Sequence, residues 1–167
     1  MGTGESDVAS WLIIPNSIRA VERITPINIM LFTIGRYLIL LDEIEASYEW
    51  IQSIKPKIMS KYNFSEKTCH EWVFQQKEGI SDGNQVDLSA LATADLSMTA
   101  GACFAMGLKY MGTQNERAAK VLEHVTKELI QYLKPEPAMT SFNDFVSITI
   151  LEHAIGKGLF CLLRSIV

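Results

Sequence analysis

Cysteine and charged side chains are both scarce in this 167-residue sequence. The three cysteines, Cys69, Cys103 and Cys161, lie far apart and form none of the paired Cys-x-x-Cys motifs that hold zinc. An odd number of widely spaced cysteines also argues against a disulfide framework. We therefore expect reduced thiols, with Cys103 and Cys161 packed as small apolar side chains.

Charged residues make up 20% of the sequence, and the formal net charge is −4. This balance does not predict a basic patch of the kind that binds nucleic acid or anionic lipid. The mean hydropathy of +0.13 is on the apolar side for a soluble domain. Two explanations stay open, namely a well-filled core or apolar surface that a neighbouring protein covers.

Targeting and membrane-spanning segments are not predicted. The first ten residues are polar and acidic and lack the basic region of a secretory signal peptide. The longest apolar run, Ile27–Leu41, is short for a membrane span and contains Gly35 and Arg36. We expect a core helix there, in which Arg36 reaches the helix edge or pairs with Asp42, with Glu43 or with a partner subunit.

The sequence contains no recognisable catalytic or cofactor-binding constellation. Cys69 and His70 are adjacent, but further soft metal ligands at the required spacing are missing. The glycines of residues 101–112 follow no predicted strand and precede no Gly-Lys-Ser/Thr motif, so no dinucleotide or phosphate loop is predicted. We expect no catalytic, metal or cofactor site. The alternative is a free-standing ligand- or metal-binding domain that uses Cys69 and His70.

The chain is organised around residues 96–115, LSMTAGACFAMGLKYMGTQN, in which Lys109 is the only charge. Ser97, Gly101 and Ala105 recur every four residues. On a helix this spacing places them on one face, where another backbone can approach closely. An almost uncharged helix must be buried on most sides.

This helix is predicted to be the first of a helical hairpin. It begins after Asp87, its N-cap, and ends before Gly112, which adopts a left-handed conformation at little cost. A second helix is predicted over Glu116–Leu133 from its apolar stripe and its Glu–Lys pairs four residues apart. Thr113, in a capping box, and Asn115 are the two candidate N-caps of that helix.

Shorter helices and packed aromatic residues are predicted upstream. Thr25, as N-cap, and Pro26 begin a helix that should run to about Ile44. One or two helical turns are expected over Ser17–Ile24, and two short helices separated by a proline over Glu45–Tyr62. Each tryptophan could anchor a partner, but local packing is expected for Trp11, Trp50 and Trp72.

These segments divide the chain into a flexible leader (1–10), an N-terminal helical section (11–78), a loop (79–86) and a repeat region (87–167). Ala105-Met106-Gly107 and Ala154-Ile155-Gly156 are offset by 49 residues, close to the roughly 40–47-residue period of HEAT-type helix pairs. The predicted fold is all-α, with HEAT-like helical hairpins in one complete unit and part of a second. Because repeats bury their faces against neighbours, we expect a piece of a longer solenoid.

The run GACFAMGLKYMGTQN resembles the signature of the proteasome/cyclosome repeat family, in which a small-residue helix ends in a Gly-Ser/Thr-x-Asn turn. The matching positions are Gly101, Ala102, Ala105, Gly107, Leu108, Gly112, Thr113 and Asn115. Such repeats occur in the two large non-ATPase subunits of the proteasome regulatory particle and in subunit 1 of the anaphase-promoting complex. The resemblance implies that these residues form a structural repeat motif.

The N-terminal part distinguishes between these families. Residues 15–19 (PNSIR) and 24–26 (ITP), followed by Arg36, Asp42 and Trp50, resemble the segment that precedes the repeats in the anaphase-promoting complex subunit 1 family. The resemblance covers about residues 11–60 and 96–134. A repeat fragment of the proteasome regulatory particle is the alternative.

The resemblance implies a non-enzymatic scaffold segment of a multisubunit RING-type ubiquitin ligase that acts in mitosis. The expected partners are the other subunits of the anaphase-promoting complex. No cofactor, nucleic acid, membrane or small-molecule substrate is expected. The expected location is the nucleus, with the cytoplasm as a second location.

Overall fold

A computed structural model describes residues 6–61 and 86–132 of the chain. Within these two ranges all regular structure is helical, which confirms the all-α prediction for the described residues. The α-helices are α1 (Ser6–Ser10), α2 (Ile18–Val21), α3 (Pro26–Ile39), α4 (Tyr48–Ser53), α6 (Leu88–Tyr110) and α7 (Glu116–Tyr132). Two 3-10 helices, η1 (Leu41–Glu43) and η2 (Met59–Lys61), lie on either side of α4 in the sequence.

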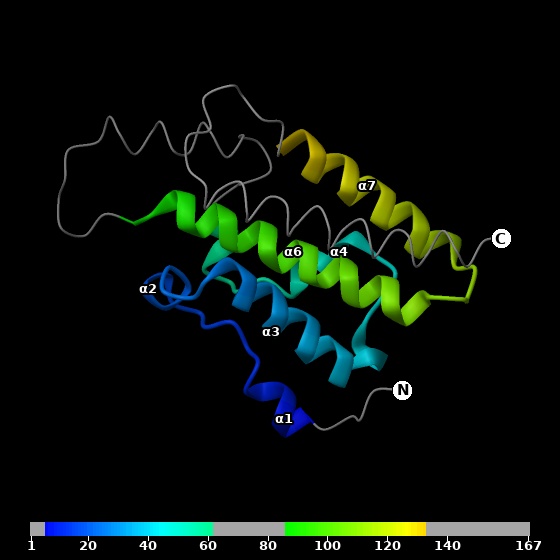
Figure 1. The fold of residues 1–167 in the computed structure, drawn as a ribbon, viewed down its shortest axis with the longest axis horizontal. Coiled ribbons are helices and arrows are strands. Elements are labelled where there is room, and N and C mark those ends of the chain that lie inside the picture. The colour runs from blue at the N-terminus through cyan, green and yellow to red at the C-terminus, as the bar shows by residue number, and fades with distance from the viewer. Residues whose placement is uncertain (1–5, 62–85, 133–167) are drawn as a thin grey trace.

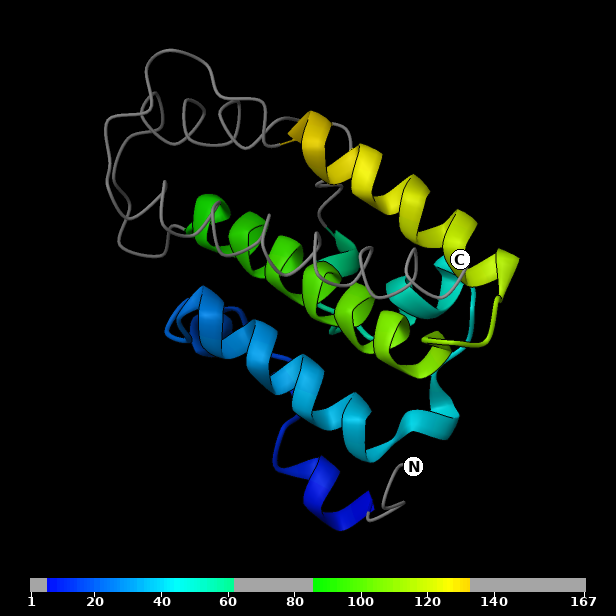
Figure 2. The same ribbon diagram turned by 45° about the vertical axis from the view of Figure 1, so that its right-hand side comes forward.

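Helix α6 lies at the centre of this arrangement. In the views of Figures 1 and 2, α3 and α7 lie on opposite sides of α6, and α1 lies beyond α3. Helix α7 runs back along α6 after a tight turn, so the predicted helical hairpin is present. Both members have the predicted bounds to within one residue at each described end.

The apolar composition of α6 is explained by its burial. Leu91, Met98, Ala102 and Met106 are each completely inaccessible to solvent. By length and composition alone, Ala90–Tyr110 could cross a membrane, but 78% of its apolar window is buried inside the protein. Helix α6 therefore has the character of a core helix, surrounded by protein on most sides.

Two clusters of buried apolar side chains meet at α6. The first joins α6 to α3, α4 and α7, and includes Met30, Tyr37, Trp50, Ile51, Ala105, Met106, Leu122 and Val125. The second joins the N-terminal half of α6 to α2, α3 and η2, and includes Val21, Ile29, Met59, Leu91 and Met98. The three longest described helices, α3, α6 and α7, thus pack together in the core, with α6 in both clusters.

Helix α3 approaches α6 very closely at Gly101. A Cβ atom built onto Gly101 would lie 2.8 Å from Cβ of Thr33 and 2.9 Å from the carbonyl oxygen of Met30. The Thr33 side chain is itself held, because its hydroxyl donates a hydrogen bond to the carbonyl oxygen of Ile29 at 2.9 Å. The predicted close backbone approach is confirmed at Gly101, and the approaching helix is α3 rather than α7.

Helix α3 begins as predicted but ends early. Thr25 is its N-cap residue and Pro26 its first residue, although the Thr25 side chain makes no capping hydrogen bond. The predicted end at Ile44 is wrong, since the helix stops at Ile39 and Leu40 has φ −99° and ψ 45°. This break turns the chain through η1 and brings Ile44 into the core, where it is 1% exposed.

The shorter predicted helices are largely confirmed. Helix α2 lies within Ser17–Ile24, and the two helices expected in the following segment are α4 and the 3-10 helix η2. Ser47 caps α4, because its hydroxyl accepts a hydrogen bond from the backbone N–H of Trp50 at 3.1 Å. Pro56 lies between α4 and η2, where it excludes a continuous helix.

The polar face of α7 agrees with its prediction. The Nζ of Lys127 lies 2.7 Å from Oε1 of Glu123, and the Nζ of Lys120 lies 3.9 Å from Oε2 of Glu116. Both pairs are largely exposed to solvent, so each adds little stability. On the opposite face, Ala118, Leu122 and Val125 are buried and Val121 is half-buried.

Residues 6–10 of the expected leader form α1, and Ala9 in this helix is fully buried. The Nη1 atom of Arg36 donates a hydrogen bond to the Ala9 carbonyl oxygen at 2.7 Å. Of the alternatives expected for Arg36, namely the helix edge, Asp42, Glu43 or a partner subunit, neither carboxylate is paired with it among the described residues, and its bond goes to a backbone carbonyl instead. The Ala9 carbonyl oxygen also accepts a hydrogen bond from the N–H of Leu12 at 3.2 Å. It lies at the C-terminal end of α1, where the helix dipole favours a cation.

The tryptophans behave differently from one another. Trp50 is buried and packs edge to face on Tyr37, with ring centroids 5.0 Å apart. Trp11 is 79% exposed, so the prediction of local packing is wrong for it, because its neighbours Ala9 and Leu12 make the contacts with α3. Trp72 lies outside the described residues.

Several further predictions also concern residues outside the described ranges. They are the Cys69–His70 pair, Cys161, most of the 79–86 loop and the second repeat unit of residues 133–167.

Two matched substitutions test the contact between α3 and α6. Gly101→Ala should destabilise the fold by about 1–3 kcal/mol, because its Cβ would overlap the α3 backbone and a fixed Thr33 side chain. Gly35→Ala should be neutral or stabilising by up to about 1 kcal/mol, because its Cβ would meet only the end of the flexible Leu12 side chain. Urea unfolding followed by circular dichroism measures both. Equal effects of the two substitutions would contradict the close approach.

Candidate functional site

The Gly-Thr-x-Asn turn between α6 and α7 is built by specific backbone conformations. Gly112 has φ +77°, in the left-handed region, and no atom lies within 4 Å of a Cβ built onto it. Glycine is therefore favoured here by conformation and not by lack of space. Gln114 also has a positive φ of 53°. The prediction that Gly112 ends the first helix is confirmed.

Thr113 and Asn115 each satisfy backbone groups at a different helix end. The Thr113 hydroxyl donates a hydrogen bond to the carbonyl oxygen of Tyr110 at 2.7 Å, at the end of α6. The Oδ1 atom of Asn115 accepts a hydrogen bond from the N–H of Ala118 at 3.0 Å, at the start of α7. Asn115 is therefore the N-cap, and the capping-box alternative with Thr113 is wrong.

The other motif residues lie along α6. Ala102, Ala105 and Gly107 are buried, and Leu108 is half-buried. Ala102 and Ala105 belong to the same core cluster as Ala118, Leu122 and Val125 of α7. The small residues of α6 therefore lie where two other helices pack. Gly101 lies against α3, and Ala102 and Ala105 lie in the core cluster that includes residues of α7. Their role as a structural repeat motif stays a prediction.

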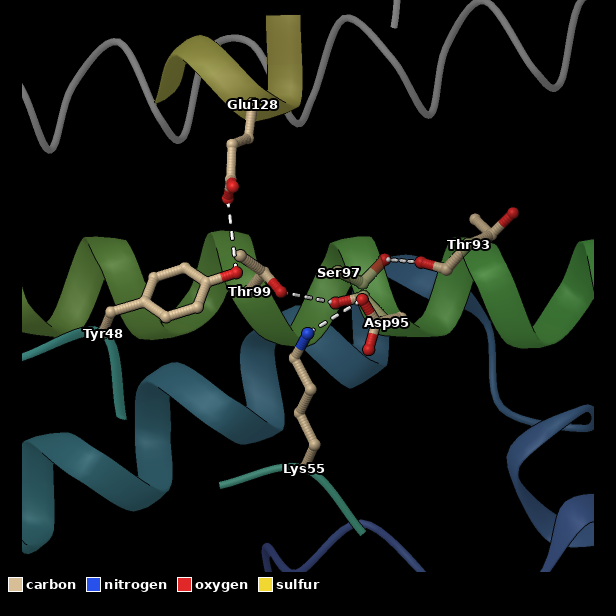
Figure 3. A network of polar contacts seen from close by, with 7 residues as sticks. All are labelled: Tyr48, Lys55, Thr93, Asp95, Ser97, Thr99 and Glu128. Atoms are coloured by element: carbon tan, nitrogen blue, oxygen red, sulfur yellow. Dashed lines mark hydrogen bonds and ion pairs between the residues drawn. The ribbon is translucent and has the colours of Figure 1, made fainter. Parts of the chain in front are cut away.

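A largely buried ion pair anchors the middle of α6. The Nζ of Lys55 lies 2.9 Å from Oδ2 of Asp95, and the two side chains are 13% and 15% exposed (Figure 3). This pair was missed from the sequence, although Asp95 is the only charge within residues 88–108. A single carboxylate in a buried helix needs a partner of opposite charge, and this requirement could have predicted an ion pair at Asp95.

The hydroxyl groups next to this ion pair are satisfied within α6. The Thr99 hydroxyl donates to the carbonyl oxygen of Asp95 at 2.9 Å, and the Ser97 hydroxyl donates to that of Thr93 at 2.8 Å (Figure 3). Such bonds to the preceding turn let small polar residues be buried without a partner on another helix. They position no nucleophile next to a base.

Helix α7 is linked to α4 through Tyr48. The Tyr48 hydroxyl donates to Oε2 of Glu128 over a long 3.4 Å, and the rings of Tyr48 and His124 meet edge to face at 5.7 Å (Figure 3 shows the first contact). Burial, followed by the Glu128 charge, raises the pKa of Tyr48. These exposed or half-buried contacts hold α7 against α4.

Lys109 fixes the break after α3 to the end of α6. Its Nζ donates to the carbonyl oxygen of Ile44 at 2.6 Å and to that of Asp42 at 3.3 Å. The Tyr110 hydroxyl also donates to the Ile44 carbonyl oxygen, at 3.3 Å. Lys109, the only charged residue within residues 96–115, thus binds backbone carbonyl oxygens of the same chain.

Cys103 is buried, as predicted, and packs as a small apolar side chain. Burial raises the pKa of its thiol to about 12. The reactive thiolate form is therefore disfavoured near neutral pH. Among residues 6–61 and 86–132, no group of three or more histidine, cysteine or acidic residues is placed to hold a metal ion.

Comparison with known proteins gives a consistent family assignment. Residues 1–162 match the family model of the APC1 fifth domain. The chain is similar to "Anaphase-promoting complex subunit 1" of Mus musculus and of Homo sapiens, with 27% identity over 167 residues in each. It is 29% identical over 152 residues to the protein of the same name from Schizosaccharomyces pombe. These matches cover 93%, 93% and 91% of this chain, but only 8%, 8% and 9% of the relatives.

The turn assignment is tested by two alanine substitutions. Asn115→Ala should destabilise the chain by about 1 kcal/mol, because the N–H of Ala118 loses its capping acceptor. Thr113→Ala should have a smaller effect, because its hydroxyl bond is exposed and the Tyr110 carbonyl oxygen still accepts a hydrogen bond from the backbone N–H of residue 113. Thermal unfolding of both variants under one buffer condition provides the comparison. A larger loss for Thr113→Ala would favour the capping box instead.

Removing one charge, and then both, tests the Lys55–Asp95 pair. Asp95→Asn should destabilise the fold by about 2–3 kcal/mol, since it leaves the ammonium of Lys55 largely buried without its counter-charge. Lys55→Met combined with Asp95→Leu should recover most of that loss.

The control for this comparison is Glu123→Gln, which breaks an exposed pair on α7 and should change stability little. Chemical unfolding at neutral pH measures all three variants against the wild-type chain. If Asp95→Asn were as mild as Glu123→Gln, the ion pair would not anchor α6.

Proposed function

Because this chain belongs to the APC1 fifth-domain family, we propose that it is a non-enzymatic scaffold segment of the anaphase-promoting complex. The observation that carries this proposal is the match of residues 1–162 to the family, together with relatives named as subunit 1 of that complex. The chain spans about 8% of the length of the mammalian relatives. The proposed role is therefore that of one part of a large subunit.

In this proposal the complex is a multisubunit cell-cycle ubiquitin ligase, and the chain contributes to it through helix packing and partner surfaces. Its partners are the other subunits of the complex. We propose a nuclear location during mitosis, with the cytoplasm as a second location. A net charge of −4 supports a partner other than nucleic acid or an anionic membrane surface.

The polar groups of the described core support a mechanical rather than a chemical role. Lys55 and Asp95 neutralise one another, Arg36 binds a backbone carbonyl, and burial disfavours the Cys103 thiolate. Each of these groups is engaged in holding one helix against another or is shielded from solvent. A scaffold needs such internal pairing, because it must present its surfaces in a fixed arrangement.

We further propose that the α6–α7 hairpin is one unit of a HEAT-like stack. Its first helix is buried on both sides, and its Gly-Thr-x-Asn turn matches the repeat signature. Solenoid units of this kind bury their apolar faces only against neighbouring units. The continuation of the pattern would come from residues 133–167 and from neighbouring parts of a longer subunit.

Co-purification tests the proposed membership. The full chain is expressed with an affinity tag and purified from mitotic cells. The proteins that co-purify with it are identified by mass spectrometry. We expect the other subunits of the anaphase-promoting complex with the wild-type chain and with Gly35→Ala. Gly101→Leu should lose them, because overpacking separates α3 from α6.

Two outcomes would contradict this proposal. Recovery with proteasome regulatory-particle subunits would favour the other family that shares the repeat signature. A purified monomeric chain that retains a stoichiometric metal ion in native mass spectrometry would favour the ligand- or metal-binding alternative at Cys69 and His70.

A further inference from the structure

Residues 6–13, here called the α1 latch, consist of α1 and the turn that follows it. In both ribbon views α1 lies beyond α3, on the side away from α6 (Figures 1 and 2). A helix of five residues is too short to be stable through its own hydrogen bonds. The latch therefore owes its structure to its contacts with α3.

The latch buries little apolar surface. Ala9 is completely inaccessible to solvent and belongs to the first core cluster, and Leu12 is half-buried. The Cδ1 atom of Leu12 lies 3.1 Å from a Cβ built onto Gly35 of α3. The other large apolar side chains of the latch are exposed, namely Val8 (36%), Trp11 (79%) and Ile13 (53%). One methyl group and part of one leucine are a small apolar contact for a segment of this length.

A single hydrogen bond joins the latch to the rest of the described residues. The Nη1 atom of Arg36 donates it to the carbonyl oxygen of Ala9 at 2.7 Å. The C-terminal turn of the latch closes its hydrogen bonds within itself, from the N–H groups of Trp11, Leu12 and Ile13 to the carbonyl oxygens of Val8, Ala9 and Ser10. The guanidinium of Arg36 also lies over the Tyr37 ring, 5.9 Å from its centroid, so α3 itself holds this side chain in place.

The chain is anchored again immediately after the latch. Ile14 is 8% exposed and packs in the second core cluster. The Oδ1 atom of Asn16 accepts a hydrogen bond from the N–H of Ile58 at 3.0 Å, which fixes this part of the chain beside η2. A movement of the latch would therefore end at Ile14 and would remove only Ala9 from the core clusters.

We propose that the α1 latch opens and closes on α3 as a unit while α3, α6 and α7 stay folded, with the bond between Arg36 and Ala9 as its catch. Segments with few buried apolar contacts open locally at a lower free energy than global unfolding. The latch meets this condition, and its boundary coincides with the first residue that is buried in the second core cluster.

Opening changes the outer surface of α3. In the closed state the latch covers Gly35, and the carbonyl oxygen of Ala9 binds the guanidinium of Arg36. Opening uncovers both groups on the part of α3 between Leu31 and Leu38, which are already 53% and 40% exposed. The latch thus sets how much of this surface is available and whether its cation is bound. This device lies within the chain and does not depend on the proposed assembly into the complex.

Hydrogen–deuterium exchange of the full chain, measured by mass spectrometry under native conditions, tests the opening. Peptides that cover residues 6–13 should exchange at least about tenfold faster than those that cover α3 and α6. They should still exchange more slowly than an unstructured peptide, because the N–H groups of Trp11 and Leu12 are hydrogen-bonded in the closed state. Exchange at the rate of α3 would overturn the proposal, and so would exchange without any protection.

Arg36→Met tests the catch, because methionine keeps an apolar side chain beside Tyr37 but has no donor for the Ala9 carbonyl oxygen. Exchange of residues 6–13 should become about tenfold faster, the effect of one lost hydrogen bond from a charged group. The matched control is Lys109→Met, which removes another cation bound to a backbone carbonyl, at Ile44, and should leave the latch unchanged. An equal response of the latch to both variants would show that Arg36 is not its catch.

Ala9→Lys separates opening of the latch from loss of the core. A lysine does not fit at a fully buried position, so residues 6–13 should lose nearly all of their protection while α3 and α6 keep theirs. The urea midpoint of global unfolding should fall much less than in Gly101→Leu, whose side chain would separate α3 from α6. Equal losses in the two variants would place the latch in the cooperative core and overturn the proposal.

Discussion

The arrangement of the described helices depends on the close contact between α3 and α6 at Gly101. The carbonyl oxygen of Met30 and the side chain of Thr33 occupy the space that any Cβ would need. Two helices at this separation exclude water and bring the flanking apolar residues of both into van der Waals contact. Because α6 also packs on α4 and α7, a shift at this one contact would disturb both core clusters.

A second constraint comes from the scarcity of charge. In a nearly uncharged core, each polar group must find a partner within the protein, and the described groups do so mainly through backbone carbonyls. Arg36 binds Ala9, and Lys109 binds Ile44. Asp95 is different, because its carboxylate is paired with an ammonium from a segment 40 residues earlier in the chain. The Arg36 bond fixes α1 to α3, and the Lys109 and Asp95 bonds fix the residues after η1 and after α4 to α6.

The family assignment and the packing support one proposal about function. A chain that matches less than a tenth of its relatives, and whose buried polar groups hold helices together, is suited to work as one piece of a larger scaffold. Trp11 and the α3 residues Ile27, Leu31 and Leu38 are exposed apolar side chains.

The sequence by itself determined the local features, including both hairpin helices, the left-handed Gly112 and the Pro26 helix start, because each depends on neighbouring residues. It also showed that α6 must be buried. Only the tertiary structure decided which helix fills the space at Gly101, which carbonyl receives Arg36, and that Trp11 stays exposed. Those outcomes depend on residues distant in sequence, whose proximity no local pattern encodes.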